Sequence, residues 1–191
     1  MDKTKDDQAP RAPDSASADP TPVLPALELR PLLDSDLPQI QRLDERAFGP
    51  GRFARSAYRL REGVEPDYSL SCVAHVGTFL VGSNLMTPVL AGGEPALLLG
   101  PLTVDPSFRS RGIGEALIKR SISLARNSGH RLVLLVGDLS FYGKIGFKPA
   151  RPGQFTFPGP VDPARLLVCE LSDGALEALN GPITRARTAT A

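Results

Sequence analysis

The sequence predicts one α/β domain built on a mixed, mostly antiparallel sheet. Three observations support this prediction. The chain of 191 residues is long enough for one domain with a sizeable core and short for two. Its 18 glycines and 19 prolines require many loops and disfavour a simple helical bundle. Short apolar segments also alternate with segments of helical periodicity.

The two ends of the chain lack the residues needed for a core. Residues 1–25 contain five prolines and are otherwise rich in Asp, Ala, Ser and Thr, so we expect a disordered tail that cannot offset its ordering entropy. Residues 181–191 have a similar composition and predict a flexible C-terminal tail. The folded domain is therefore expected over residues 26–180.

The first elements follow from spacing and from breaks in the pattern. Residues 27–32 indicate a short strand, and residues 36–47 indicate a helix with an aspartate as its N-cap. The Gly-Pro-Gly sequence at 49–51 ends this helix. A second helix is expected over 53–62.

The middle of the chain predicts three consecutive strands. Residues 69–76 and 78–90 indicate antiparallel strands that turn at Gly77, and residues 96–104 indicate the next strand. Pro101 interrupts this last strand and cannot donate a ladder hydrogen bond. We therefore expect a bulge or a splayed edge at Pro101.

The second half contains the clearest helix. Residues 112–127 place apolar side chains on one side and basic side chains on the other. Residues 131–137 form a continuous apolar run, which is typical of a strand covered on both faces. A short helix over 139–145 and strands near 147–149 and 165–171 complete the predicted domain.

Composition disfavours several kinds of partner. A net charge of +1 gives no bulk electrostatic reason for binding nucleic acid or an anionic membrane. Cys72, Cys169 and two histidines are too few for a structural zinc site, so no metal is expected. No secretory signal is visible, and no apolar run reaches the roughly 20 residues that cross a bilayer. We expect a cytoplasmic protein with reduced thiols and no membrane partner.

The most informative segment follows the strand that ends at Val104. Gly112 and Gly114 open a helix whose first N–H groups are unpaired and carry the positive end of the helix dipole. Arg109 and Arg111 add positive charge, so the segment can form a phosphate cradle. A glycine-rich turn with solvated arginines is the alternative. The Walker A and Rossmann patterns fit poorly, because Gly-Lys-Ser/Thr and the third glycine are missing.

Two motifs together resemble the GNAT superfamily of N-acyltransferases. Arg109-x-x-Gly112-x-Gly114 is similar to the family's acyl-CoA-binding motif, Gln/Arg-x-x-Gly-x-Gly/Ala. Residues 141–147 (FYGKIGF) look like its second hallmark, Phe-Tyr-x-Lys/Arg-x-Gly-Phe. The element order over about 27–171 also agrees. The resemblance implies a bacterial-type N-acetyltransferase with a GNAT-like sheet, a central splay in that sheet and helices on both faces.

The resemblance implies a role for each matching residue. The strand end at 102–104 would pair with the pantetheine arm of acetyl-CoA, the acyl donor. The bulge would leave the N–H of Leu102 free for the thioester oxygen. The amides of 110–114 would hold the pyrophosphate, with Arg109 nearby. The implied cofactor-binding residues are Leu102, Thr103, Val104, Arg109, Ser110, Arg111, Gly112, Ile113 and Gly114.

Tyr142 lies in the second motif and is predicted to be the general acid. Acyl transfer to an amine expels a thiolate, and a phenol with a pKa of about 10 can protonate it. An aromatic side chain packed in the core is the alternative. The general base of one family branch, a glutamate on the fourth strand, is absent from residues 96–104. Asp138 is the candidate base. The other candidates are Glu65, Glu94, His75 and a water chain.

The acceptor side carries fewer signals. Five arginines between residues 46 and 61 predict a solvated face, with a rim for an acidic acceptor as the alternative. The resemblance implies direct acetyl transfer to a primary amine of a small molecule or peptide in a ternary complex, with no nucleic acid, by a monomer or homodimer. A non-catalytic acyl-CoA-binding regulatory module is the other hypothesis. Such a module would keep residues 102–114 but would not need Tyr142.

Overall fold

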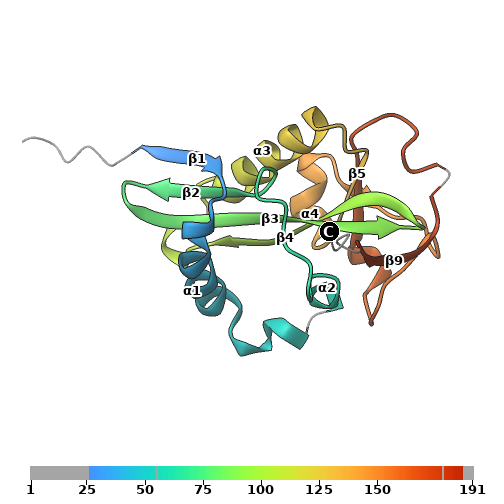
Figure 1. Ribbon diagram of the computed structural model, residues 1–191, viewed down its shortest axis with the longest axis horizontal. Coiled ribbons are helices and arrows are strands. Elements are labelled where there is room, and N and C mark those ends of the chain that lie inside the picture. The colour runs from blue at the N-terminus through green and yellow to red at the C-terminus, as the bar shows by residue number, and fades with distance from the viewer. Residues whose placement is uncertain (1–25, 55, 178, 187–191) are drawn as a thin grey trace, which may run out of the picture.

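The computed structural model describes residues 26–54, 56–177 and 179–186. The tail predicted over 1–25 lies outside these residues. The centre of the molecule is a mixed sheet in the order β1-β2-β3-β4-β5-β8-β6, in which only the β4–β5 pair is parallel (Figure 1). This confirms the predicted fold class. The strands are β1 (Leu27–Pro31), β2 (Cys72–Val76), β3 (Phe79–Ala91), β4 (Glu94–Val104), β5 (Leu132–Val136), β6 (Lys148–Pro149), β7 (Phe155–Thr156), β8 (Leu166–Glu170) and β9 (Gly181–Arg185).

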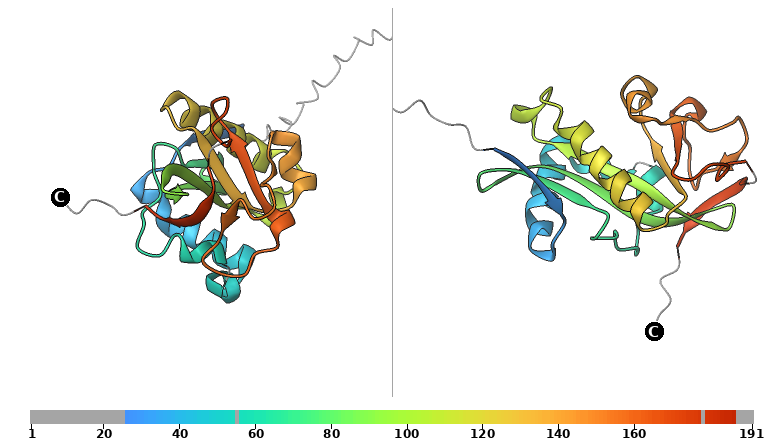
Figure 2. Two further views of the ribbon diagram at one scale, coloured as in Figure 1. Left: turned by 90° about the vertical axis from the view of Figure 1, so that its right-hand side faces the viewer. Right: turned by 90° about the horizontal axis from the view of Figure 1, so that it is seen from above.

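Helices cover both faces of the sheet. Helix α3 lies across one face, and α1 and α2 lie on the other (Figures 1 and 2). The apolar side of α3 buries Leu117 and Ile118 against the strands, and α1 buries Leu43 on the opposite face. None of the helices described by the structure is long and apolar enough to cross a membrane. The helices are α1 (Leu37–Phe48), α2 (Ser56–Arg59), α3 (Ile113–Asn127) and α4 (Leu139–Tyr142).

The sheet opens between β4 and β5. These strands pair only at Leu97 and Leu98, so the edge of β4 that faces β5 has no ladder partner beyond this point. On the other edge of β4, the register with β3 shifts opposite Gly100-Pro101, where β4 has one residue more than β3. The shift confirms the bulge expected from Pro101. Gly100 has a φ of +108°, which only glycine adopts readily.

The C-terminal boundary predicted from the sequence needs correction. Residues 181–185, expected in a flexible tail, form β9 instead. Strand β3 extends beyond β2 and leaves an open edge, and β9 pairs with that edge at Val89–Ala91. Ile183 is buried, with 2% of its surface exposed. A five-residue strand with one large apolar residue and a proline carries little hydrophobic signal, which is why the composition was misleading.

Candidate active site

The loop between β4 and α3 has the backbone shape of an anion-binding site. Ser110 and Gly112 adopt left-handed conformations, with φ values of +61° and +77°. When left-handed residues alternate with others along a loop, successive backbone N–H groups turn towards one side. Helix α3 begins at Ile113, so the amides of its first turn have no intrahelical acceptor. An added β-carbon at Gly112 would meet nothing within 4 Å, which leaves this side of the loop open.

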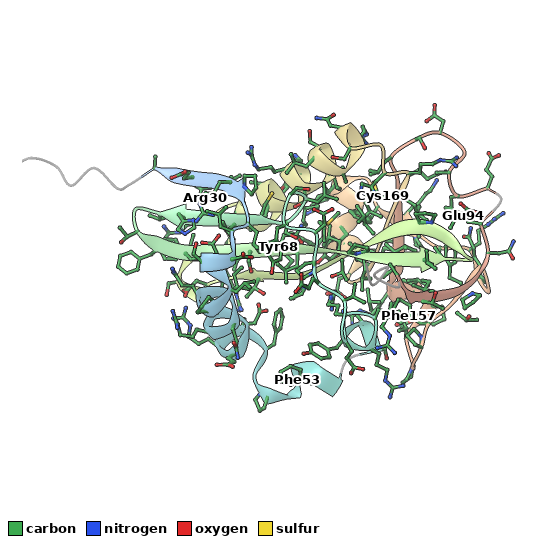
Figure 3. All side chains as sticks on the ribbon, viewed as in Figure 1. Arg30, Phe53, Tyr68, Glu94, Phe157 and Cys169 are labelled. Atoms are coloured by element: carbon green, nitrogen blue, oxygen red, sulfur yellow. The ribbon has the colours of Figure 1, made fainter. Side chains whose placement is uncertain are left out.

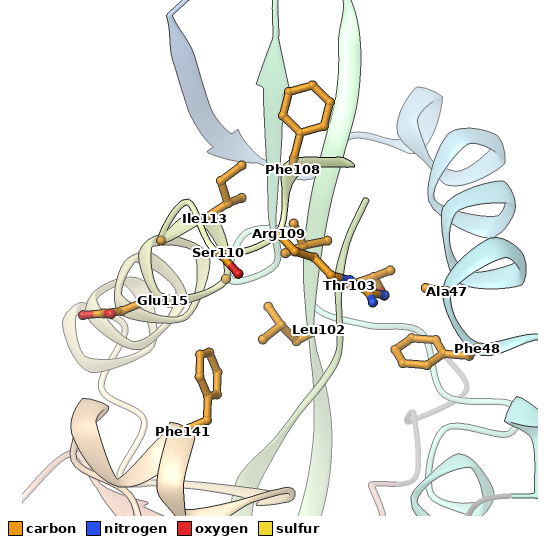
Figure 4. Close-up of a pocket in the computed structure, with 13 residues that line it drawn as sticks. Ala47, Phe48, Leu102, Thr103, Phe108, Arg109, Ser110, Ile113, Glu115 and Phe141 are labelled. Atoms are coloured by element: carbon orange, nitrogen blue, oxygen red, sulfur yellow. The ribbon is translucent and has the colours of Figure 1, made fainter. Parts of the chain in front are cut away.

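A cleft of about 300 Å³ lies beside this loop (Figure 4). Phe48 of α1 and Phe141 of α4 also line it. Arg111 is absent from the lining, and its guanidinium lies 5.1 Å from the ring centre of Phe108. The residues predicted to bind the cofactor that do line the cleft are Leu102, Thr103, Val104, Arg109, Ser110, Gly112, Ile113 and Gly114.

A second, larger cavity of about 1030 Å³ adjoins the cleft. Its walls come from α1, the α2 segment, the bulge of β4, the end of β5, α4 and the loop before β8. Phe48 and Leu102 line both spaces. The two spaces therefore meet at the point where β4 leaves β5. A donor in the cleft and an acceptor in the cavity can approach each other there.

Tyr142 lies in the wall of the second cavity. Its half-buried ring contacts Phe141 and Phe147 edge to face, with centroid separations of 4.9 and 5.8 Å. Burial raises the pKa of the Tyr142 phenol, the carboxylate of Asp138 adds to this, and nearby guanidinium groups oppose it. The phenol therefore keeps its proton at neutral pH and has one to donate.

The candidate bases are placed very differently. Asp138 lines the second cavity, and its exposed carboxylate pairs with Nε of Arg165 at 3.3 Å. The lining residues of this cavity do not include Glu65, His75 or Glu94. Glu94 stands at the β3–β4 turn (Figure 3). Of the candidate acids and bases from the sequence, Asp138 and Tyr142 line this cavity together, and Leu102 also lines it.

The structure adds Asp44, which sequence reasoning did not single out, and gives a distinct position to Arg61, one of the five arginines considered as a rim for an acidic acceptor. Both line the second cavity. The carboxylate of Asp44 accepts a hydrogen bond from Oγ1 of Thr103. Asp44 follows Leu37 and Ile40 at helical spacing, so its position on the sheet side of α1 was a usable signal.

Of the described arginines between 46 and 61, Arg46 and Arg59 are exposed, as expected of a solvated face, whereas Arg61 is half-buried. Arg46 pairs with Asp105 at 3.2 Å, and Arg59 donates to the carbonyl oxygen of Pro158 at 2.8 Å. Arg61 points to β4, where Nη2 donates to the carbonyl oxygen of Leu99 at 3.4 Å. The side chains of the arginines at 52 and 55 lie outside the described part of the structure.

Comparison with known proteins identifies the family. A model described as "Acetyltransferase (GNAT) domain" matches residues 67–149. The uncharacterized N-acetyltransferase YjhQ of Escherichia coli K12 is 32% identical over 130 residues, which cover 66% of this chain and 71% of that protein. The uncharacterized N-acetyltransferase YhbS of the same strain is 27% identical over 148 residues, or 76% of this chain and 88% of that protein.

Solved structures agree with this result. The crystal structure of YhbS from E. coli in complex with CoA gives a TM-score of 0.72 at 25% identity, covering 88% of this chain and 94% of that one. A GNAT family acetyltransferase from Brucella melitensis in complex with acetyl-CoA gives 0.55 at 28% identity, covering 78% and 97%. The chain belongs to the GNAT family and is an N-acetyltransferase.

Proposed function

We propose that this enzyme transfers the acetyl group of acetyl-CoA, held in the cleft, directly to a primary amine held in the second cavity. The pyrophosphate of the donor binds the amides of 110–114, with Arg109 beside it. The pantetheine arm lies along the unpaired edge of β4. The thioester oxygen then faces the N–H of Leu102. The left-handed loop and the open strand edge support this arrangement.

The reaction proceeds in one complex without a covalent enzyme intermediate. The amine nitrogen attacks the thioester carbon, and the negative charge on the former carbonyl oxygen is stabilised by the Leu102 N–H. The C–S bond then breaks, and the thiolate takes the proton of the Tyr142 hydroxyl. The attacking nitrogen loses its remaining extra proton as the amide forms, and this proton returns through water to the tyrosinate and restores the phenol. The protein contributes mainly by positioning the two substrates, because both are held where the cleft and the second cavity meet.

The acceptor ammonium must lose a proton before it attacks. We propose that Asp138 accepts this proton, directly or through water. Asp44 is the alternative acceptor in the same cavity. Asp162 also lines the cavity, but its carboxylate accepts the N–H of Ala164 at 2.9 Å and caps a local turn. Comparing Asp138→Asn with Asp44→Asn distinguishes the two assignments. The variant that lacks the true base should have a kcat/KM lower by about tenfold or more at neutral pH. Its kcat/KM should recover at higher pH, where free amine is abundant.

The observation that carries the proposal is the meeting of cleft and cavity at Leu102, with Tyr142 in the cavity wall. A regulatory acyl-CoA-binding module would need the cleft alone. Thiol release from acetyl-CoA in the presence of a panel of amines tests the difference, alongside calorimetry of acetyl-CoA binding. We expect amine-dependent release. Binding without release for any amine would favour the regulatory module.

A further inference from the structure

Arg61 is a charged side chain held at the point where β4 bulges. Leu60, which is 1% exposed, anchors the chain in the core, and the N–H of Arg61 donates to the carbonyl oxygen of Tyr58 at 2.9 Å. The side chain of Arg61 extends from there to β4, where its Nη2 donates to the carbonyl oxygen of Leu99. Gly100 leaves room for this approach, because a β-carbon added at Gly100 would lie 3.2 Å from Nη2. The guanidinium therefore lies against the bulge.

Packing alone does not explain a charge at this position. The Nε of Arg61 is buried and has no hydrogen-bond partner within the described part of the chain, and no described carboxylate forms an ion pair with this residue. Burial lowers the pKa of Arg61 to about 10, opposed chiefly by the Asp44 carboxylate, so the group stays charged at neutral pH. A charged side chain that is buried with an unsatisfied donor destabilises the fold, which points to a role in function.

The same bulge carries the N–H group that is proposed to face the thioester oxygen. The position of a β-carbon at Gly100 lies 3.5 Å from the backbone nitrogen of Leu102, as well as 3.2 Å from Nη2 of Arg61. The cation and the N–H nitrogen therefore border the space that a side chain at residue 100 would occupy. Arg61, Gly100 and Leu102 all line the second cavity, close to the place proposed for the acetyl group.

Negative charge develops at this place during acyl transfer. The thioester oxygen carries a partial charge in the ground state and becomes an oxyanion when the amine attacks the carbonyl carbon. A fixed cation nearby stabilises the oxyanion more than the ground state, and so accelerates the reaction. We infer that the charge of Arg61 stabilises the oxyanion, in addition to the hydrogen bond from the Leu102 N–H. The inference rests on the proposed function and adds a charged group to a site that otherwise offers a backbone amide.

Infrared spectroscopy of the bound donor tests the inference before the acceptor is known. Acetyl-CoA labelled with carbon-13 at the thioester carbonyl is bound without amine, and the label isolates the stretch of this C=O bond. A nearby positive charge polarises the bond and lowers its stretching frequency. We expect a lower frequency in the wild-type complex than in Arg61→Met, which keeps the length of the side chain and removes the charge. The Asp44 carboxylate is present in both proteins, so the difference reports on Arg61.

Further variants separate the charge of Arg61 from its structural contacts. Arg61→Lys keeps the charge without the planar group and should retain part of the frequency shift. Arg59→Met is the structural control, because it removes a hydrogen bond to the Pro158 carbonyl oxygen from the same segment, but Arg59 lies outside the cavity lining. The carbonyl frequency in this control should match the wild type. Calorimetry should give an acetyl-CoA Kd within about twofold of the wild type for each variant, because the ground state gains little from the charge.

Steady-state kinetics connect the spectroscopic signal to the reaction. The assay uses saturating acetyl-CoA and the amine that gives the most thiol release. Removing a direct oxyanion donor typically lowers kcat by about 10²–10³-fold, and a charge that acts across the space at Gly100 should contribute less. We expect kcat of Arg61→Met to fall by about tenfold or more, with Arg61→Lys between this variant and the wild type.

Several outcomes would overturn the inference. Equal carbonyl frequencies in the wild-type and Arg61→Met complexes would do so, as would an equal change in Arg59→Met or a kcat of Arg61→Met within about twofold of wild type. If Arg61→Met does not fold, Arg61→Gln, which is neutral but polar, takes its place. If acetyl-CoA binds but no amine is acetylated, the infrared comparison decides. If acetyl-CoA does not bind the wild type, the proposed function fails and the inference fails with it.

Discussion

The ring of Tyr142 lies directly on the backbone of Gly137. A β-carbon at Gly137 would be 2.3 Å from Cε2 and 2.7 Å from Cδ2 of that ring. Gly137 follows the end of β5, and Tyr142 is the last residue of α4, so the contact seats the short helix on the strand. The position of the phenol therefore depends on the absence of a side chain at residue 137.

Gly137→Ala should move Tyr142 and lower activity. The new methyl group collides with a ring held by two aromatic neighbours, so the phenol must shift, and a displacement of about 1 Å can cost about 10²-fold in rate. Steady-state kinetics would measure the loss. Gly143→Ala is the control, because its β-carbon meets only the flexible Leu139 side chain at 3.3 Å. A Gly137→Ala enzyme as active as this control would contradict the prediction.

Tyr142→Phe separates a general acid from a packing role. It keeps the ring contacts with Phe141 and Phe147 and removes only the hydroxyl. We expect kcat to fall by about 10²-fold, with acetyl-CoA affinity unchanged and stability reduced by no more than about 1–2 kcal/mol. A CoA thiolate can leave without full protonation, since thiol pKa values are about 8.5, so the rate loss can be smaller than this. A loss below about tenfold, with chemistry rate-limiting, would end the general-acid assignment.

Gly112→Asp should weaken acetyl-CoA binding through its charge. An added β-carbon at Gly112 meets nothing within 4 Å, and Asp and Asn tolerate the left-handed backbone better than most residues. Gly112→Asn is therefore a matched control of the same size. Calorimetry should show a clearly larger Kd for the aspartate variant, with a gap between the two that narrows at high salt. Equal affinity of the two variants for acetyl-CoA would show that the pyrophosphate does not bind at this loop.

Asp36 should make stability depend on pH. Its carboxylate accepts bonds from Arg30 at 2.7 and 2.8 Å and from the N–H of Leu33 at 2.9 Å, and these bonds lower the pKa of Asp36. A group with a lowered folded-state pKa stabilises above its unfolded value and loses that effect on acidification. Asp36→Asn should therefore be less stable than wild type by about 1–3 kcal/mol at pH 7. Urea unfolding at several pH values should show this gap closing below a pH of about 4. A stability difference between the two proteins that does not change with pH would contradict the role given to the Asp36 carboxylate.

The sequence was informative where a signal was local. Gly112 after a strand and a proline inside a strand each favour a particular backbone geometry by themselves, so the left-handed turn before α3 and the bulge at Pro101 were predictable. The position of Arg61 was not predictable, because it follows from long-range packing of Leu60 and from the room at Gly100. Strand β9 also depends on distant partners, as its pairing with β3 joins residues far apart in the chain.

The separation of β4 from β5 leaves a gap in the backbone hydrogen bonding of the sheet. Past Leu98 the two halves of the sheet are joined by side-chain packing rather than by a continuous backbone ladder. A pantetheine arm lying in this gap, as proposed, restores main-chain bonds across the weakest line of the molecule. By mass action, a donor present at a hundred times its Kd adds about 2.7 kcal/mol to the free energy of unfolding. The supply of the acyl donor would then affect the stability of the folded enzyme as well as its rate of turnover.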